Sequence, residues 1–305
     1  MSIEKTDKIW MNGELVDWDK AQIHILTHTL HYGTGVFEGI RAYETDDGPA
    51  VFRLTDHVVR LFESAAIMMM DIPYTVDEII DAIKLTVRST GLPSCYIRPI
   101  AYYGYGEMGL NTIPCSVDVA IACWPWGAYL GDDAVTKGVR MKVSSWNRHD
   151  PNTMPPTSKT TGNYVNSSLA KVEALKAGYD EAIMLNPTGD VSECTGENLF
   201  CGRKDELIMP PPGAGALEGI TQDSVVTIAR DLGYTVRAAT LTRSDLYVAE
   251  ELFVCGTAAE ISAVNSVDDR SIPCPGPKTT AIAAEFSKAV RGKTDRYKDW
   301  VEHVG

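Results

Sequence analysis

The sequence contains no long apolar run that could cross a membrane. A membrane-spanning helix needs about 18 or more successive apolar residues, and no segment of the chain approaches that length. The polar start MSIEKTDKIW lacks the apolar core of a signal peptide, so we expect it to remain in the mature protein. Hydrophobic residues still make up 44% of the 305 residues, which is enough to fill one large domain or two ordinary ones.

Positive charge is scarce. Lysine and arginine total 28 against 41 aspartates and glutamates, which gives a net charge of −13. This balance argues against nucleic acid or an anionic membrane as a partner. An anionic small molecule remains compatible with it, because a local pocket can be positive on an acidic protein.

Patterns typical of disulfide frameworks, metal sites and dinucleotide sites are missing as well. The seven cysteines are an odd number and form no C-x-x-C pair, so we expect reduced thiols and a cytoplasmic protein. His24, His28 and His31 have a metal-like spacing, but no carboxylate stands where a zinc motif requires one, and we predict no metal. The glycines of residues 33–39 do not match G-x-G-x-x-G, which argues against a dinucleotide fingerprint.

Strand and helix patterns alternate along the chain. The NG of KIWMNGELV and the DDG of AYETDDGPAVF predict β-hairpins. One helix is predicted over 55–70 with Thr55 or Asp56 as its cap, and another runs from a Thr75 cap to a stop at Gly91. Further strands are predicted at GVRMKVSSW, EAIMLN, NLFCGR, ELIMP and ELFVCG, and further helices at NYVNSSLAKVEALKAG, TQDSVVTIARDLG and TTAIAAEFSKAV.

This order predicts a two-domain protein of the α+β or α/β class. We expect a small N-terminal domain over residues 1–127, an interdomain linker loop over 128–136 and a large C-terminal domain over 137–305. Clefts between domains commonly hold ligands, so we expect the ligand site in the cleft between these two domains.

One lysine stands alone in the segment PPTSKTTGNYVNSS. Around Lys159, no other charged residue occurs from 152 to 166. A lysine is a nucleophile only when it is uncharged, and surroundings poor in charge favour that form and hence Schiff-base chemistry. An exposed loop lysine would show the same pattern, so the assignment depends on partners elsewhere in the chain.

Three later motifs could supply these partners. Glu193 and Glu197 in VSECTGENLF could place a carboxylate against a pyridinium nitrogen, although a capping glutamate fits equally. The segment LEGITQ begins a helix whose first N–H groups suit a phosphate, and the strand ELFVC runs into GTAA, a second turn with exposed N–H groups. Each of these motifs also occurs as an ordinary turn or helix start.

The strand YIRPI carries an arginine among apolar residues. Strand alternation places Tyr96, Arg98 and Ile100 on one face. An arginine in such a strand is rarely buried without an anion, which is either a bound ligand or one of the chain's own carboxylates.

Taken together, these motifs resemble the branched-chain amino acid aminotransferases of pyridoxal-phosphate fold class IV. The resemblance is carried by YGTGVFEGIRAY, PWGAYLG, the lysine before GNY, SECTGENLF, EGIT and CGTAAEI in this order, and it runs from about residue 8 to residue 290. It implies a two-domain fold with pyridoxal 5'-phosphate in the cleft, where the C-terminal domain binds the cofactor.

The resemblance also implies roles for individual residues. Lys159 matches the catalytic lysine that forms the Schiff base and moves the proton at the substrate Cα, and Glu193 matches the acid at the pyridine nitrogen. The implied cofactor-binding residues are Arg60, Lys159, Tyr164, Glu193, Leu217, Gly219, Ile220, Thr221, Gly256 and Thr257. The implied substrate-binding residues are Tyr32, Phe37, Tyr96, Arg98, Leu110, Trp126, Tyr129, Thr257 and Ala258, of which Tyr32 and Leu110 would come from a second subunit.

The implied activity is transamination of leucine, isoleucine and valine with 2-oxoglutarate in two half-reactions, as in branched-chain amino acid biosynthesis. The implied partners are amino acids, 2-oxoacids and further copies of the chain, as a homodimer or a higher homo-oligomer up to a hexamer. A D-amino-acid or (R)-amine transaminase and an aminodeoxychorismate lyase are alternatives within the same fold class. A cofactor-binding protein without turnover is the alternative from another class.

Overall fold

The computed structural model describes residues 3–127, 130–131 and 134–305. The chain divides into two compact units. Unit 1 contains residues 1–126, 158–163 and 289–305, and unit 2 contains residues 127–157 and 164–288. Among the described residues, no helix combines the length and the apolar character that crossing a membrane requires.

Unit 1 is built on an eight-stranded sheet with the order β17-β5-β4-β6-β7-β1-β2, and β3 pairs with β6 beside this path. Its described strand pairs are antiparallel. The strands are β1 (Lys8–Met11), β2 (Glu14–Asp17), β3 (Gly35–Phe37), β4 (Ile40–Thr45), β5 (Gly48–Phe52), β6 (Cys95–Tyr103), β7 (Val117–Trp124) and β17 (Val301–His303).

The predicted hairpins of unit 1 are confirmed. Met11 pairs with Glu14, so Asn12 and Gly13 form a two-residue loop, and both have a positive φ, of 48° and 105°. Such a turn needs residues that tolerate left-handed conformations, which Asn-Gly supplies. The second hairpin joins β4 to β5, with Thr45 opposite Gly48.

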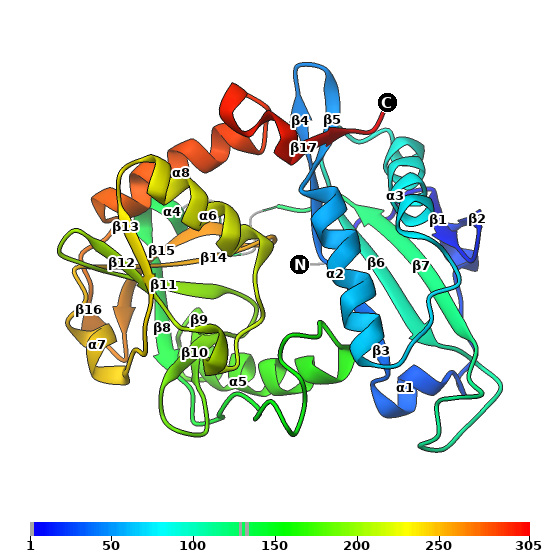
Figure 1. Ribbon diagram of the computed structural model, residues 1–305, viewed down its shortest axis with the longest axis horizontal. Coiled ribbons are helices and arrows are strands. Elements are labelled where there is room, and N and C mark those ends of the chain that lie inside the picture. The colour runs from blue at the N-terminus through cyan, green and yellow to red at the C-terminus, as the bar shows by residue number, and fades with distance from the viewer. Residues whose placement is uncertain (1–2, 128–129, 132–133) are drawn as a thin grey trace. The chain divides into compact units, whose positions relative to one another are not determined.

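Two long helices cover the sheet of unit 1, α2 (Leu54–Ile67) and α3 (Val76–Thr90), and they lie side by side (Figure 1). Their buried residues, among them Val58, Leu61 and Ile83, join the apolar core of the sheet. The helix α3 has the predicted Thr75 cap, which forms a capping box with Glu78, and it ends at Gly91 with φ 66°. A short helix, α1 (His28–Tyr32), precedes β3.

The predicted cap of α2 is wrong. Arg53 is the N-cap, in a left-handed conformation, and its side chain makes no capping bond, whereas Glu302 Oε1 accepts the first-turn N–H of Thr55 at 2.9 Å. The carboxylate of Asp56 instead pairs with the Arg53 side chain, and the Thr55 hydroxyl donates to Glu302 Oε1 at 2.9 Å. The two expected caps are therefore occupied by other partners, one of them far along the chain.

Unit 2 contains a nine-stranded mixed sheet with the order β10-β9-β8-β15-β14-β11-β12-β13, to which β16 adds beside β15. The pairs β8–β9, β8–β15 and β12–β13 are parallel. The strands are β8 (Val139–Val143), β9 (Glu181–Leu185), β10 (Val191–Cys194), β11 (Asn198–Arg203), β12 (Glu206–Met209), β13 (Thr235–Ala238), β14 (Glu251–Gly256), β15 (Glu260–Val267) and β16 (Arg270–Ser271).

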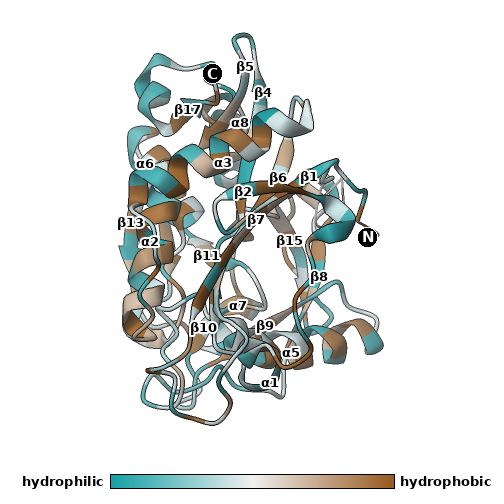
Figure 2. Cartoon of the chain, turned by 90° about the vertical axis from the view of Figure 1, so that its right-hand side faces the viewer, coloured by the Kyte–Doolittle hydropathy of each residue, from teal (hydrophilic) through white to brown (hydrophobic). Residues whose placement is uncertain are grey.

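The helices of unit 2 include α5 (Tyr164–Lys176), which packs on β9, and α6 (Ile220–Asp231), which packs on β13 and β14. Hydrophobic and hydrophilic residues alternate along α5 (Figure 2), and Ala170 and Ala174 are its buried contacts with the strand. The helix α8 is capped by a distant carboxylate, because buried Glu251 accepts the Thr279 N–H at 2.9 Å and pairs with Lys278 at 3.1 Å. These helices are α4 (Ala134–Lys137), α5 (Tyr164–Lys176), α6 (Ile220–Asp231), α7 (Arg243–Tyr247) and α8 (Pro277–Ala289).

The two units differ from the expected division into 1–127, 128–136 and 137–305. Residues 158–163, which include Lys159, and residues 289–305 belong to unit 1. The reason is pairing between distant segments: β17 pairs with β5, and Thr160 forms a β-bridge with Val36. A division of the sequence into consecutive ranges cannot place in one unit two segments that are distant in the chain but paired in the fold.

Candidate active site

The backbone of Lys159 is fixed on both sides in unit 1. Its N–H donates to Ser64 Oγ of α2 at 3.0 Å, and its carbonyl accepts the Phe37 N–H at 3.0 Å. Ser158 adds a bond from its hydroxyl to the Ser64 carbonyl at 3.2 Å. The Lys159 Nζ lies 5.3 Å from the centre of the Phe37 ring. The lysine that the sequence singled out is thus half-buried beside an aromatic residue of the predicted substrate group.

Arg60, the predicted phosphate residue of unit 1, projects from α2 one helical turn before Ser64. Its Nε and Nη2 donate to the two oxygens of Glu38 at 2.7 and 2.8 Å. Glu38 is fully buried directly after Phe37. The structure therefore places Arg60 and Lys159 on the same side of α2, within one group of contacts.

Arg98 and Tyr96 stand side by side on β6, as predicted. The Arg98 Nη2 donates to the Tyr96 hydroxyl at 3.1 Å, and the Arg98 guanidinium lies 4.7 Å from the centre of the Phe37 ring. The Trp126 and Tyr96 rings are 5.0 Å apart. A Cβ atom at Gly39 would lie 2.1 Å from the Tyr96 hydroxyl, so only glycine leaves room for this tyrosine.

Two predicted substrate residues lie on the surface of unit 1. Tyr32, in α1, is 41% exposed, and Leu110 is 87% exposed. The loop that carries Leu110 is tied to α1, because His28 Nε2 bonds the Gly109 carbonyl at 2.7 Å. Their exposure is compatible with the expected contribution to a second subunit, which stays a prediction. The predicted residue Tyr129 lies outside the described residues.

The structure also gives the histidine motif a role without a metal. His28 uses its other nitrogen, Nδ1, to bond Thr34 Oγ1 at 2.7 Å, so both ring nitrogens have partners within unit 1. Within residues 3–127, 130–131 and 134–305, no three His, Cys, Asp or Glu side chains gather as a metal site.

In unit 2, Glu193 is clamped by three donors. Its Oε1 pairs with Arg148 Nη2 at 2.7 Å, and its Oε2 accepts the Leu217 N–H at 3.1 Å and the Asn198 amide at 3.4 Å. Both Arg148 and Glu193 are buried. Charge-assisted bonds of this kind fix the orientation of the carboxylate.

The neighbouring Glu197 has different surroundings. It is buried close to Glu181 and accepts the Gly196 N–H at 3.2 Å. Burial raises the pKa of Glu197 to about 8, and the negative charge of Glu181 acts in the same direction. Glu197 is therefore mainly protonated at neutral pH, whereas Glu193 has a buried arginine as its ion-pair partner.

The predicted anion site at the start of α6 lies beside this clamp. Gly219 is the N-cap and has no side chain that could cap the helix, whose first residues are Ile220 and Thr221. Asn198 connects the carboxylate of Glu193 to the segment before α6, because its amide also donates to the Leu217 carbonyl at 3.0 Å. A Cβ atom at Gly219 would lie 2.0 Å from Asn198 Oδ1. Only glycine therefore allows the helix end and Asn198 to approach so closely.

The second predicted turn lies at the end of β14. Gly256 pairs with Glu260, so Thr257, Ala258 and Ala259 form the loop of the β14–β15 hairpin. Asn198, at the start of β11, is opposite Cys255 on β14, one residue before Gly256. The hairpin loop thus belongs to the same end of the sheet as the Glu193 clamp.

Tyr164 is the first residue of α5 and is half-buried. One turn further along this helix, Ser167 Oγ accepts a bond from Arg148 Nη1 at 3.2 Å. Residues three apart lie on one face of a helix, so Tyr164 shares the face that meets Arg148. Arg148, the ion-pair partner of Glu193, thus connects this face of α5 to the Glu193 clamp.

Sequence reasoning missed Arg148, Asn198, Glu38 and His57. Asn198 occurs in the quoted motif SECTGENLF and Glu38 in GVFEGI, but neither motif shows that the side chain is buried against a cation or a carboxylate. Arg148 follows β8 in SSWNRHDP, where nothing local predicts an inward orientation.

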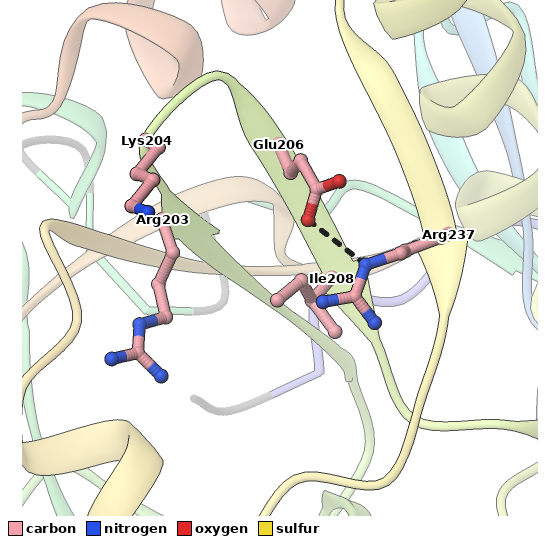
Figure 3. Close-up of a pocket in the computed structure, with 5 residues that line it drawn as sticks. All are labelled: Arg203, Lys204, Glu206, Ile208 and Arg237. Atoms are coloured by element: carbon pink, nitrogen blue, oxygen red, sulfur yellow. Dashed lines mark hydrogen bonds and ion pairs between the residues drawn. The ribbon is translucent and has the colours of Figure 1, made fainter.

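A separate cavity of about 250 Å³ lies on unit 2 at the strands β11, β12 and β13 (Figure 3). Glu206 and Ile208 line it together with three cationic side chains, Arg203, Lys204 and Arg237. Arg237 pairs with Glu206 at 2.9 Å. The predicted site residues do not line this cavity, and it has no part in the candidate site.

Comparison with known proteins identifies the family. The family model for class IV amino-transferases matches residues 35–267. A branched-chain-amino-acid aminotransferase of Pseudomonas aeruginosa is 46% identical over 294 residues, which cover 96% of this chain and 95% of the relative. A crystal structure of the Escherichia coli branched-chain amino acid aminotransferase has a TM-score of 0.96 and 44% identity, and covers 99% of this chain and 100% of that chain.

A branched-chain amino acid aminotransferase from T.th., solved with pyridoxamine 5'-phosphate, also has a TM-score of 0.96, with 47% identity and 99% of each chain covered. A second structure of that protein is a complex with N-(5'-phosphopyridoxyl)-L-glutamate. With nearly complete coverage at these identities, and a family model that spans most of its length, the chain belongs to the class IV aminotransferases.

Proposed function

We propose that this chain is a pyridoxal 5'-phosphate-dependent transaminase that acts on leucine, isoleucine and valine with 2-oxoglutarate. The residues present fit the cofactor. The start of α6, where Gly219 is the N-cap, suits a phosphate, and the Glu193 clamp suits a protonated pyridine nitrogen. Structures of the T.th. relative with pyridoxamine phosphate and with a phosphopyridoxyl-glutamate support the same cofactor.

The bound cofactor supplies a pyridine ring that withdraws electrons from the substrate Cα. In unit 2, Glu193 would hold the pyridine nitrogen, and the side chain of Tyr164 the phenolic oxygen. Ile220, Thr221 and Thr257 would bind the phosphate together with Arg60 of unit 1. Leu217, Gly219 and Gly256 would contribute backbone atoms at these positions.

Lys159 would carry the proton chemistry. Its Nζ would take the proton from the substrate Cα and pass it to the C4′ position of the cofactor. Its backbone is fixed by Ser64 and Phe37, so only the side chain has to move. Tyr96 and the Thr257–Ala258 turn would bind the α-carboxylate that all substrates share.

The observation that carries the substrate assignment is Arg98 among aromatic side chains. Phe37, Tyr96, Trp124 and Trp126 form an apolar surface suited to branched side chains. The Arg98 guanidinium lies within it and suits the γ-carboxylate of glutamate or 2-oxoglutarate. One site can thus accept both a neutral and an acidic substrate. Tyr129, together with Tyr32 and Leu110 of a second subunit, would complete the apolar surface.

This last contribution requires self-association, and we propose a homodimer or a higher homo-oligomer. Exposed apolar side chains at Leu30, Tyr32 and Leu110 support such an interface. We further propose a cytoplasmic location, which the seven free cysteines support.

A donor panel tests the proposal. The purified protein is mixed with the cofactor and then with L-leucine, D-alanine or an (R)-amine, first without an acceptor to follow the cofactor band and then with 2-oxoglutarate to measure turnover. We expect a visible absorption band of the bound cofactor that L-leucine bleaches and D-alanine does not. Bleaching by D-alanine or by the (R)-amine alone would assign the protein to another branch of the family. Absence of the band would leave the transaminase proposal without support.

A further inference from the structure

Glu38, His57 and Arg60, the arginine that is proposed to bind the phosphate, form a hydrogen-bonded triad in unit 1. Glu38 and His57 are 0% and 1% exposed. Glu38 Oε2 accepts from His57 Nδ1 at 2.7 Å and from Arg60 Nη2 at 2.8 Å, and its Oε1 accepts from Arg60 Nε at 2.7 Å. One carboxylate therefore holds an arginine along two bonds and a histidine along a third.

The three side chains of the triad differ in charge. Burial alone would raise the pKa of Glu38, but the Arg60 charge and the His57 bond outweigh it and hold this pKa well below its usual range. Burial lowers the pKa of His57, and the charges of Arg60 and Lys159 add to this effect although Glu38 opposes it. Glu38 is thus an anion that receives bonds from Arg60 and from a neutral imidazole.

The triad is rigidly connected to the lysine segment. His57, Arg60 and Ser64 follow one face of α2, and Ser64 holds the backbone of Lys159. Glu38 donates its own N–H to the Pro99 carbonyl at 2.9 Å, and the preceding residue, Phe37, bonds the Lys159 carbonyl. The backbone of Glu38 is therefore fixed to the sheet, while the guanidinium that its carboxylate holds projects from the helix.

We propose that Glu38 is a positioning residue for Arg60, which it holds in the orientation that binds the cofactor phosphate, and that His57 keeps Glu38 in place. This inference rests on the proposed function, in which Arg60 contacts the phosphate. A guanidinium has five N–H donors in one plane, so the two bonds to Glu38 determine where the other donors point. An arginine that is already ordered loses less rotamer entropy when it binds an anion.

Glu38 also has an electrostatic effect, which opposes phosphate binding. Its negative charge repels a phosphate and partly cancels the charge of Arg60. A substitution of Glu38 by glutamine therefore distinguishes the two effects by sign. Loss of positioning weakens phosphate binding, whereas loss of repulsion strengthens it.

The experiment measures cofactor binding to the apoenzyme by the visible absorption band, and the binding of inorganic phosphate by competition. We expect Glu38→Gln to weaken both by about tenfold to thirtyfold, which corresponds to the side-chain ordering that an arginine requires. At saturating cofactor, the KM for leucine should remain within about twofold. The matched control is Glu251→Gln, which removes another buried, ion-paired carboxylate outside the site and should leave cofactor binding unchanged.

A double-mutant cycle tests whether Glu38 acts through Arg60. Lysine at position 60 keeps the charge but lacks the fork, so Glu38→Gln should change cofactor binding less than about threefold in the Arg60→Lys background. An equal loss in both backgrounds would overturn the proposal, as would unchanged or tighter binding in Glu38→Gln alone. If Glu38→Gln fails to fold, His57→Gln decides in the same assay: weaker binding supports the proposal, and unchanged binding overturns it. A wild-type protein that binds no cofactor would refute the proposed function rather than this inference.

Discussion

Replacement of Arg98 by leucine should separate the two half-reactions of the proposed cycle. Leucine and 2-oxoglutarate share the α-carboxylate, but only the second has a γ-carboxylate. Arg98 lies over Phe37 and donates to the Tyr96 hydroxyl at 3.1 Å, while its Nε has no hydrogen-bond partner among the described residues. Because the guanidinium is only partly used within the protein, it can take an anionic substrate group.

The expected loss follows from this environment. Removing one partner of a buried charge pair costs about 2–5 kcal/mol, so the half-reaction with 2-oxoglutarate should slow about 30-fold to several thousandfold. The leucine half-reaction loses only the contact of the guanidinium with the rings and one bond to Tyr96, which is about 1 kcal/mol, or roughly fivefold.

Single-turnover kinetics with each substrate measure the two losses separately. Arg270→Leu is the matched control, since it removes another arginine stacked on a tyrosine, 4.0 Å from the ring of Tyr247, away from the site. This control should change neither half-reaction. Equal losses with leucine and 2-oxoglutarate in Arg98→Leu would mean that Arg98 binds the α-carboxylate or supports the fold, and would refute the reasoning.

Three further predictions concern Lys159, Glu193 and Glu197. Lys159→Ala should lower turnover by on the order of 10³-fold or more but keep cofactor binding in equilibrium dialysis, because the phosphate contacts remain; full activity would contradict the proposed role. Glu193→Gln should slow the single turnover of leucine by about 10²- to 10³-fold, beyond any loss of cofactor, and an unchanged rate would assign the pyridine nitrogen to another residue. The pKa of Glu197 is raised from 4.5 to about 8, so the folded state binds the extra proton, and the free energy of unfolding should fall as pH rises between these values, by on the order of a few kcal/mol. Glu197→Gln should flatten that dependence in urea unfolding measured from pH 5 to pH 9, and a slope that persists would show that other groups cause it.

Local signals in the sequence predicted most of the elements correctly. The Asn12-Gly13 turn and the Thr75 capping box depend on residues that are neighbours in the chain, and both are confirmed. The cap of α2 was predicted by the same local reasoning and is wrong, because Thr55 bonds Glu302. Reasoning from neighbours fails where a partner from a distant segment competes for the same side chain.

The division into units shows the same limit on a larger scale. Lys159 lies in the middle of the chain, yet its segment belongs to the unit formed mainly by residues 1–126. Its backbone partners, Ser64 and Phe37, are about a hundred residues away in sequence. The chemical type of the residue was apparent from the sequence, whereas the contacts that fix it depend on tertiary structure.

The two carboxylates of VSECTGENLF show why motif reasoning needs the fold to assign roles. Glu193 and Glu197 are four residues apart, and both are buried, so neither spacing nor burial tells which one carries a negative charge. The difference comes from the surroundings that folding gives them: Arg148, from the segment after β8, pairs with Glu193, whereas burial, together with the negative charge of Glu181 on β9, raises the pKa of Glu197. A carboxylate can stabilise a protonated pyridine nitrogen only while it is ionised, and a protonated carboxyl group cannot do so by charge. We therefore expect Glu193, which is paired with the arginine, to hold the pyridine nitrogen, and we expect Glu197, which is buried beside Glu181, not to do so at neutral pH.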